Sequence, residues 1–171
     1  MRSPQDEINL RRIGVDDWRL WRKLRLEALE EAPYAFSSRL CDWQGDGDTE
    51  TRWRGRLSSV PLNIVAVWNE TAAGMVSATA LNQDGTVELI SMWVAPFARG
   101  HGIGHSLVNA VVEWAREQMA SRVALAVFES NEHALTLYRR HRFVDIGPVA
   151  STSSRTPTEL HLVRDLLQDY C

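Results

Sequence analysis

The segment VAPFARGHGIGHSL, from Val94 to Leu107, holds three glycines within five residues, with an arginine before them and an apolar run behind them. Glycine at this density marks a turn that requires positive φ or a place where another group approaches the main chain closely. The segment lies between an expected strand and an expected helix. Several backbone N–H groups would then point the same way at a helix N-terminus, where the helix dipole adds positive potential. This is typical of a phosphate site, although a strand-to-helix turn without a ligand can carry the same glycines.

Two common phosphate motifs do not fit this segment. It contains no GK[ST] of a P-loop, and Leu107 stands where the third glycine of GxGxxG would be. A dinucleotide-binding loop normally follows the first strand of a parallel unit, whereas this loop follows the fourth expected strand. The pattern that remains is R/Q-x-x-G-x-G/A, formed by Arg99, Gly102 and Gly104.

With this pattern, the sequence resembles the GNAT superfamily of N-acetyltransferases. A second pattern, N-x-x-A-x-x-x-Y at Asn131, Ala134 and Tyr138, strengthens the resemblance, which covers roughly 8–164 and is strongest over 87–143. The resemblance implies that the loop binds the pyrophosphate of the cosubstrate acetyl-CoA and that the preceding strand gives main-chain hydrogen bonds to pantetheine. The cofactor-binding residues that it implies are Met92, Trp93, Val94, Arg99, Gly100, His101, Gly102, Ile103, Gly104, His105, Asn131 and Tyr138.

Acetyl transfer to an amine requires the free base, and a lysine-like amine with a pKa of about 10.4 is almost fully protonated at neutral pH. A general base is therefore useful, and the resemblance implies that Glu88 has this role and contacts the acceptor. With regular alternation Glu88 shares a face with Ile90, Met92 and Val94, which predicts a carboxylate buried among apolar side chains. The alternative is an ordinary charged residue near a strand end.

Tyr138 is the second catalytic residue that the resemblance implies, as the donor of a proton to the CoA sulfur. The alternative is a buried aromatic side chain on an amphipathic helix. Asn131 would contact CoA or serve as a helix N-cap, and the backbone N–H of Val94 would polarise the thioester carbonyl. One departure from the family is Arg142, which stands where members often have glycine before the phenylalanine that corresponds to Phe143.

The histidines give no convincing metal site. His101 and His105 have a spacing found in zinc pairs, but no third ligand is evident, so we expect no metal. His133 and His141 are interpreted as surface residues of a helix. Trp93, expected across the pleat from Glu88, would line either the core or the substrate cleft.

The acceptor pocket is expected between the first two helices, in APYAFSSRLCDWQGDGDTE, with Tyr34 and Phe36 as substrate-binding residues. A small cationic amine is the favoured acceptor, because this segment is acidic, although charged loops are usually just solvated. Its acidic residues are Asp42, Asp46, Asp48 and Glu50. A protein N-terminus or lysine is the alternative acceptor, and a non-catalytic acyl-CoA sensor is the alternative from another class. Neither motif contains a cysteine, which favours direct attack in a ternary complex.

The elements that would position these residues follow from hydrophobic period and turn residues. The expected order is strand, two helices, three strands, helix, strand, helix and two strands. This order predicts an α/β fold (α+β mixed), and the resemblance makes it GNAT-like: a central mixed, mostly antiparallel sheet of about seven strands with helices on both faces. The strands are expected at 8–13, 62–68, 72–81, 86–94, 122–128, 143–149 and 158–164, and the helices at about 17–32, 48–57, 103–119 and 131–141.

Length and composition limit the classes of protein. A chain of 171 residues with 44% hydrophobic residues suits one domain, here 1–171. The 19 basic and 22 acidic residues give a net charge of −3, which disfavours nucleic acid as a partner. With two cysteines, Cys41 and Cys171, and no signal-like or membrane-length apolar run, we expect a cytoplasmic protein without membrane contact. The expected partners are a small-molecule amine or a protein amino group, with a homodimer as an option.

Overall fold

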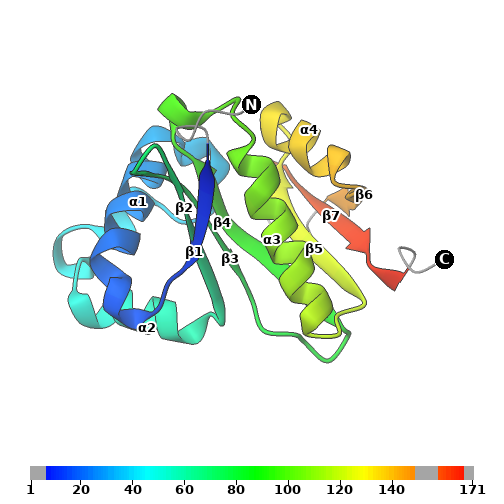
Figure 1. Cartoon of the computed structure of the whole chain (residues 1–171), viewed down its shortest axis with the longest axis horizontal. Helices are drawn as coiled ribbons and strands as arrows, with labels where there is room; N and C mark the ends of the chain where they lie inside the picture. Colours follow the sequence, from blue (N-terminus) through cyan, green and yellow to red (C-terminus); the bar gives the residue numbers. More distant parts are fainter. Residues whose placement is uncertain (1–6, 149–157, 168–171) are drawn as a thin grey trace.

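The computed structural model describes residues 7–148 and 158–167, which form one seven-stranded sheet flanked by four α-helices (Figure 1). The strands are β1 (Ile8–Arg12), β2 (Leu62–Trp68), β3 (Thr71–Ala78), β4 (Thr86–Val94), β5 (Arg122–Phe128), β6 (Val144–Pro148) and β7 (Glu159–Asp165). The helices are α1 (Trp18–Glu31), α2 (Glu50–Ser59), α3 (Ile103–Glu117) and α4 (Glu132–Arg140). The predicted fold class and order of elements are confirmed. Expectations for 1–6, 149–157 and 168–171, including Cys171, lie outside the described residues.

The sheet has the order β1-β2-β3-β4-β5-β7-β6. Neighbouring strands are antiparallel except β4 and β5, which are parallel. The pairing of β4 with β5 joins only Thr86–Glu88 to Arg122–Ala124, although β4 continues to Val94. The second half of β4 therefore has no partner strand on its β5 side among the described residues.

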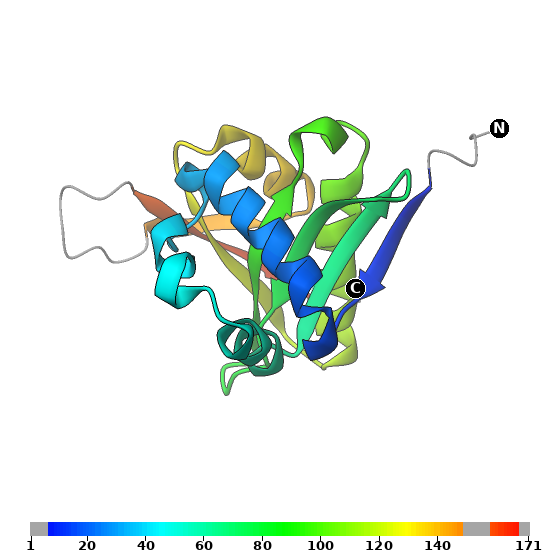
Figure 2. The same cartoon turned by 90° about the vertical axis from the view of Figure 1, so that its left-hand side faces the viewer.

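Helices α1 and α2 lie on one face of the sheet and α3 lies on the other (Figures 1 and 2). A hydrophobic cluster joins the sheet to the helices on each face. The first cluster joins the sheet to the apolar stripe of α3, in which Leu107, Val111 and Ala115 are fully buried. The second cluster joins it to α1 and α2 through Trp21 and Trp53, whose side chains are also fully buried. α3 ends at Glu117, so Met119, which lies within the expected helix 103–119, is beyond the observed helix with 86% of its surface exposed.

A β-bulge interrupts β4 in its middle. Met75 pairs with Trp93 and Ser77 with Ile90, so two residues of β4 lie opposite one residue of β3. Ser91 lies in the bulge with φ +54°, a conformation that is uncommon for residues other than glycine. An extra residue reverses the alternation of side chains beyond it, so residues on either side of the bulge exchange faces.

The bulge overturns the predicted surroundings of Glu88. Met92 and Val94 pack on the α3 side with Leu89, whereas Trp93 belongs to the cluster on the α1 and α2 side. Glu88 lies on that same α1 and α2 side and is exposed rather than buried. The prediction assumed unbroken alternation, which the bulge prevents.

The long connection between α1 and α2 consists of three short 3-10 turns, at Pro33–Ala35, Leu40–Trp43 and Gly45–Gly47. It crosses the same face of the sheet as the two helices (Figure 2). Among the described helices, none combines the length and apolar composition that a membrane-spanning segment requires.

Candidate active site

The glycine loop leads from β4 into α3. Gly100 and Gly102 have φ values of +81° and +87°, which strain any residue with a side chain, and Gly102 is the N-cap of α3. A Cβ on Gly104 would lie 3.1 Å from Leu137 Cδ2, so this glycine allows α3 to approach α4 closely. The first N–H groups of a helix have no partner within it. The loop therefore has the backbone of an anion site, with Ile103 and His105 in the first turn of the helix.

Arg99 points back from this loop toward α1 and β4. Its Nη2 donates to Glu31 Oε2 at 2.7 Å, and its Nε donates to the carbonyl oxygen of Val94 at 3.0 Å. Trp93 Nε1 donates to the same Glu31 oxygen at 3.0 Å. The hydrogen bond from Arg99 lowers the pKa of Glu31, helped by Trp93 and opposed by partial burial. Arg99 thus attaches the loop to α1 through Glu31. The role of Glu31 was not predicted from the sequence.

The two loop histidines each lie against another ring, His101 stacked and His105 tilted. The ring of His101 lies on Trp68 with 4.2 Å between centroids, and the ring of His105 lies 4.6 Å from that of His141. His141 is 5% exposed, so its predicted place on the surface is wrong. The described residues contain no cluster of three or more His, Cys, Asp or Glu side chains suited to a metal.

The backbone at Val94 is directed away from β3. The next residue, Ala95, donates its N–H to the carbonyl oxygen of Ala73 in β3 at 2.8 Å. Because successive N–H groups of a strand alternate in direction, that of Val94 points toward the β5 side, beyond the point where the β4–β5 pairing ends. This N–H is available to a group placed between the two strands.

Tyr138 lies on the opposite face of the sheet from Glu88. It belongs to the cluster under α3, is 6% exposed, and meets Phe143 edge to face with 5.8 Å between centroids. Burial raises the pKa of its phenol, so the group holds its proton at neutral pH. Arg142 has φ +64°, a conformation that favours glycine, which is the residue that the resemblance implied at this position.

Asn131 is the N-cap of α4, because its side-chain oxygen accepts the N–H of Ala134 at 3.3 Å. The interpretation of Asn131 as a helix N-cap is therefore confirmed. A contact with CoA would be an additional role of this residue.

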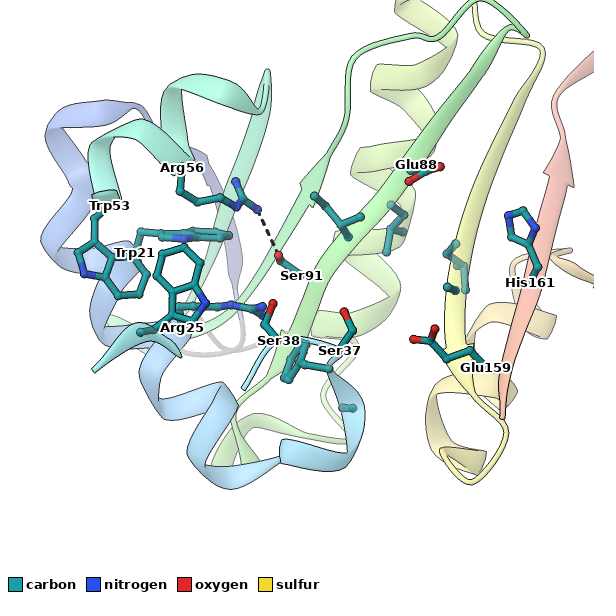
Figure 3. Close-up of a pocket in the computed structure, with 17 residues that line it drawn as sticks. Trp21, Arg25, Ser37, Ser38, Trp53, Arg56, Glu88, Ser91, Glu159 and His161 are labelled. Carbon is teal, nitrogen blue, oxygen red and sulfur yellow. Dashed lines mark hydrogen bonds between the residues drawn. The ribbon is translucent and has the colours of Figure 1, made fainter. Parts of the chain in front are cut away.

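A cavity of about 510 Å³ lies on the α1 and α2 side of β4 (Figure 3). Glu88 and the bulge residue Ser91 line it, and Phe36 closes it from the connection between the helices. Tyr34 is not among its lining residues and is 55% exposed. Several polar residues that line the cavity were not predicted from the sequence, and they come from four different elements: Arg25, Arg56, Ser91, Glu159 and His161.

The acidic residues expected to attract a cation do not line this cavity. Asp42 pairs with Arg39, Glu50 pairs with Arg54, and Asp46 is exposed. Asp48 accepts hydrogen bonds from Arg22 and from Trp53 Nε1, which lower its pKa to about 2 despite partial desolvation. Most of these carboxylates therefore stabilise the connection between α1 and α2.

Known proteins resemble this chain in sequence and in structure. Residues 18–143 match the model of the acetyltransferase (GNAT) family. Streptothricin acetyltransferase of Streptomyces lavendulae is 38% identical over 84 residues, which cover 49% of this chain and 43% of that protein; the match thus spans less than half of the curated relative.

Solved structures share the fold. A GNAT-family acetyltransferase from Streptococcus pneumoniae has a TM-score of 0.73 and 22% identity, over 93% of this chain and 99% of that chain. A putative acetyltransferase from Salmonella typhimurium, solved with acetyl-CoA, has a TM-score of 0.71 and 17% identity, over 94% of each chain. The family match covers most of the chain, and the glycine loop and the tyrosine on α4 lie within it. The chain belongs to the GNAT family of acetyltransferases, as the resemblance predicted, and acetyl-CoA is the cosubstrate that this family uses.

Proposed function

We propose that this protein is an acetyl-CoA-dependent N-acetyltransferase whose acceptor is a small-molecule primary amine. The observation that carries the proposal is the position of one strand, β4. It forms the wall of the cavity at Glu88 to Ser91 and then leads into the glycine loop that precedes α3. An acceptor in the cavity and a cosubstrate on the loop would therefore meet along β4.

The residues of the loop fit the cosubstrate. Two positive-φ glycines and the free N–H groups at the start of α3 suit a pyrophosphate, and the open edge of β4 suits the amides of pantetheine. When bound, acetyl-CoA supplies the acetyl group as a thioester. Of the residues that the resemblance implied, Gly100, Gly102 and Val94 would act through their main chain, and Arg99 would hold the loop in place.

Glu88 and Tyr138 divide the proton transfers between the two faces of the sheet. Glu88 would accept a proton from the amine, directly or through water, because it lines the acceptor cavity. Tyr138 would donate a proton to the leaving sulfur from the opposite face, where its raised pKa keeps the phenol protonated. The N–H of Val94 would polarise the carbonyl between them. Direct attack in a ternary complex agrees with this arrangement.

The volume of the cavity, about 510 Å³, favours a small molecule over a protein segment. Its wall combines aromatic side chains, Trp21, Trp43 and Trp53, with a few polar and charged ones, a lining typical of small-molecule sites. Streptothricin acetyltransferase, the relative in sequence, by its name acetylates streptothricin rather than a protein, which agrees with a small-molecule acceptor. The predicted cationic charge of the acceptor draws no support from the acidic connection between α1 and α2, because Asp42, Asp48 and Glu50 pair with arginines.

A thiol-release assay tests the proposal. The protein is incubated with acetyl-CoA and polyamines, amino acids, aminoglycosides or peptides, and free CoA is measured. We expect release above the amine-free rate with at least one small amine. Release with peptides alone would instead support a protein acceptor, and acetyl-CoA binding without turnover on any amine would support the sensor.

A further inference from the structure

Two arginines in the wall of the cavity have no carboxylate partner among the described residues. Arg25 of α1 is 8% exposed, and its Nη1 is buried without a hydrogen-bond partner. Arg56 of α2 is half-buried beside it. Other arginines of this region, such as Arg22, Arg39 and Arg54, each pair with a carboxylate. Arg25 and Arg56 therefore differ from these arginines, because no carboxylate of the described residues balances their charge.

Neutral groups surround both guanidinium groups. Arg56 donates to Asn63 Oδ1 at 3.1 Å and to Ser77 Oγ at 3.3 Å. It also donates to Ser91 Oγ at 3.2 Å (Figure 3). Its Cζ lies 5.2 Å from the centre of the Trp21 ring. The Cζ of Arg25 lies 4.6 Å from the ring centre of Phe36. These contacts orient the two groups without neutralising them.

Both arginines stay charged at neutral pH. Burial lowers the pKa of Arg25 to about 10, with a further contribution from repulsion by Arg56, and burial alone lowers the pKa of Arg56 to about 10. A buried charge without a counter-charge is strongly unfavourable, and two like charges add to the cost. Unless a counter-charge is present, Arg25 and, to a lesser degree, the half-buried Arg56 therefore cost stability, as expected of groups retained for a ligand.

The opposite wall of the cavity has the opposite charge. Glu88 on β4 and Glu159 on β7 line it across from the arginines (Figure 3). A guanidinium group binds a carboxylate in a bidentate manner, and a buried pair of them is suited to an oxyanion. A ligand that satisfies both walls has an anionic end and an amine end.

We propose that the acceptor is an amine that also bears a carboxylate, of the amino-acid class, with its carboxylate held by Arg25 and Arg56 and its amine directed toward Glu88. This inference rests on the proposed function, because it names the acceptor class of the same site. Such a carboxylate would give Arg25 and Arg56 the counter-charge that they lack among the described residues.

Matched acceptors test the charge requirement. Each amino acid in the panel is compared with its primary amide and with its decarboxylated amine, at saturating acetyl-CoA. We expect the best amino acid to have a kcat/KM about 10- to 100-fold above both analogues, the value of one or two charge-assisted hydrogen bonds. If no amino acid exceeds its amide, the inference is wrong.

An arginine variant then tests which residues recognise the carboxylate. Arg25→Met keeps the volume and removes the charge, and Arg19→Met changes an exposed arginine on the same helix that lies over Trp18. Arg25→Met should raise the KM for the amino acid about 10- to 100-fold, leave the KM for the amide within about twofold, and change kcat little. Equal effects on both acceptors would mean a structural role and would contradict the inference.

A binding measurement separates this inference from the proposed function. Thermal stability without acetyl-CoA is recorded with each amino acid and its amide, for wild type and Arg25→Met. We expect stabilisation of the wild type by the amino acid alone, and none of the variant. Stabilisation of this kind without acetyl transfer to any amine would support the carboxylate site and contradict the proposed enzymatic function. Acetyl transfer to amines without a preference for a carboxylate would support the enzymatic function and contradict the carboxylate site.

Discussion

Burial lowers the pKa of basic side chains in two regions of this molecule, with opposite consequences. In the cavity, Arg25 and Arg56 fall to a pKa of about 10 and stay charged at neutral pH. Behind the glycine loop, burial lowers the pKa of His141 to about 4, with His105 and Arg164 acting in the same direction, and the imidazole is neutral. The physical cause is the same, but arginine begins from a much higher pKa than histidine.

The difference shows that the two regions would attract anions by different means. The loop would rely on the main chain, through the N–H groups at the start of α3, because Arg99 is engaged with Glu31 and the buried histidine is uncharged. The cavity would rely on fixed side-chain charge. A main-chain site tolerates many side chains but few changes of backbone, whereas a side-chain site depends on particular residues.

The largest effect is expected from Tyr138, the one side chain on the loop side to which we assign chemistry. Tyr138→Phe should lower kcat about 10²- to 10⁴-fold and change the KM for acetyl-CoA little, because the lost hydroxyl acts on a charge that develops late in the reaction. Steady-state kinetics and a melting curve check this. A variant within about twofold of wild type would make Tyr138 a core residue.

The raised pKa of Tyr138 adds a pH test. A phenol whose pKa lies above its ordinary value of about 10 loses its proton only at higher pH. Between pH 7 and 10 the wild-type kcat should therefore not fall through ionisation of Tyr138, and any fall in this range should persist in Tyr138→Phe. A fall that is present in the wild type and absent from Tyr138→Phe would contradict the assigned environment of the hydroxyl.

The next effect tests the main-chain character of the loop. Gly102→Asp places a charge beside the expected pyrophosphate at a residue with φ +87°, and should weaken CoA binding about 100-fold, measured by calorimetry. Gly102→Asn is the matched control, because asparagine has the shape of aspartate on the same backbone and has no charge, so it should lose much less. A pantetheine thioester that lacks the pyrophosphate should be affected less than CoA. Unchanged affinity for CoA in Gly102→Asp would remove the basis of the assigned site.

The loop was predictable from the sequence because its function depends on local backbone. Positive φ at Gly100 and Gly102 and the start of α3 all follow from residues adjacent in the chain. The strands and helices were predictable for a similar reason, since periodicity is a local signal. Asn131 likewise occupies the cap position that its residue type favours.

The cavity could not be predicted because it depends on contacts between distant residues. Arg25 and Arg56 look like ordinary helix arginines until folding buries them against Phe36 and Trp21. The bulge at Ser91 has no glycine to mark it, so regular alternation placed Met92 and Val94 on the wrong face. Burial and register were thus the missing information, and neither is encoded by a short motif.

A smaller effect is expected at the acidic wall of the cavity. Glu88→Gln keeps the shape and removes the base, and should lower kcat about 10- to 100-fold. This is below the usual effect of a general base, because solvent reaches this exposed residue and can accept the proton instead. Glu159→Gln is the comparison, since this glutamate lines the same cavity from β7. Kinetics in which Glu159→Gln loses more than Glu88→Gln would assign the base to Glu159.

The smallest effect concerns stability behind the loop and tests whether His141 is held neutral. The folded-state pKa of about 4 lies below the value of about 6.5 in an unfolded chain, so the unfolded state binds more protons between these values. The stabilisation is complete above pH 6.5 and is lost as pH falls toward 4, by up to about 3 kcal/mol. His141→Leu should flatten this part of the pH dependence of unfolding in urea, whereas His133→Leu, at an exposed position of α4, should keep it. The slope with pH is the readout, because the leucine also changes packing beside His105 and shifts stability at every pH. An identical slope in wild type and His141→Leu would show that His141 takes up its proton in the folded state, and the contrast with the cavity arginines would then be lost.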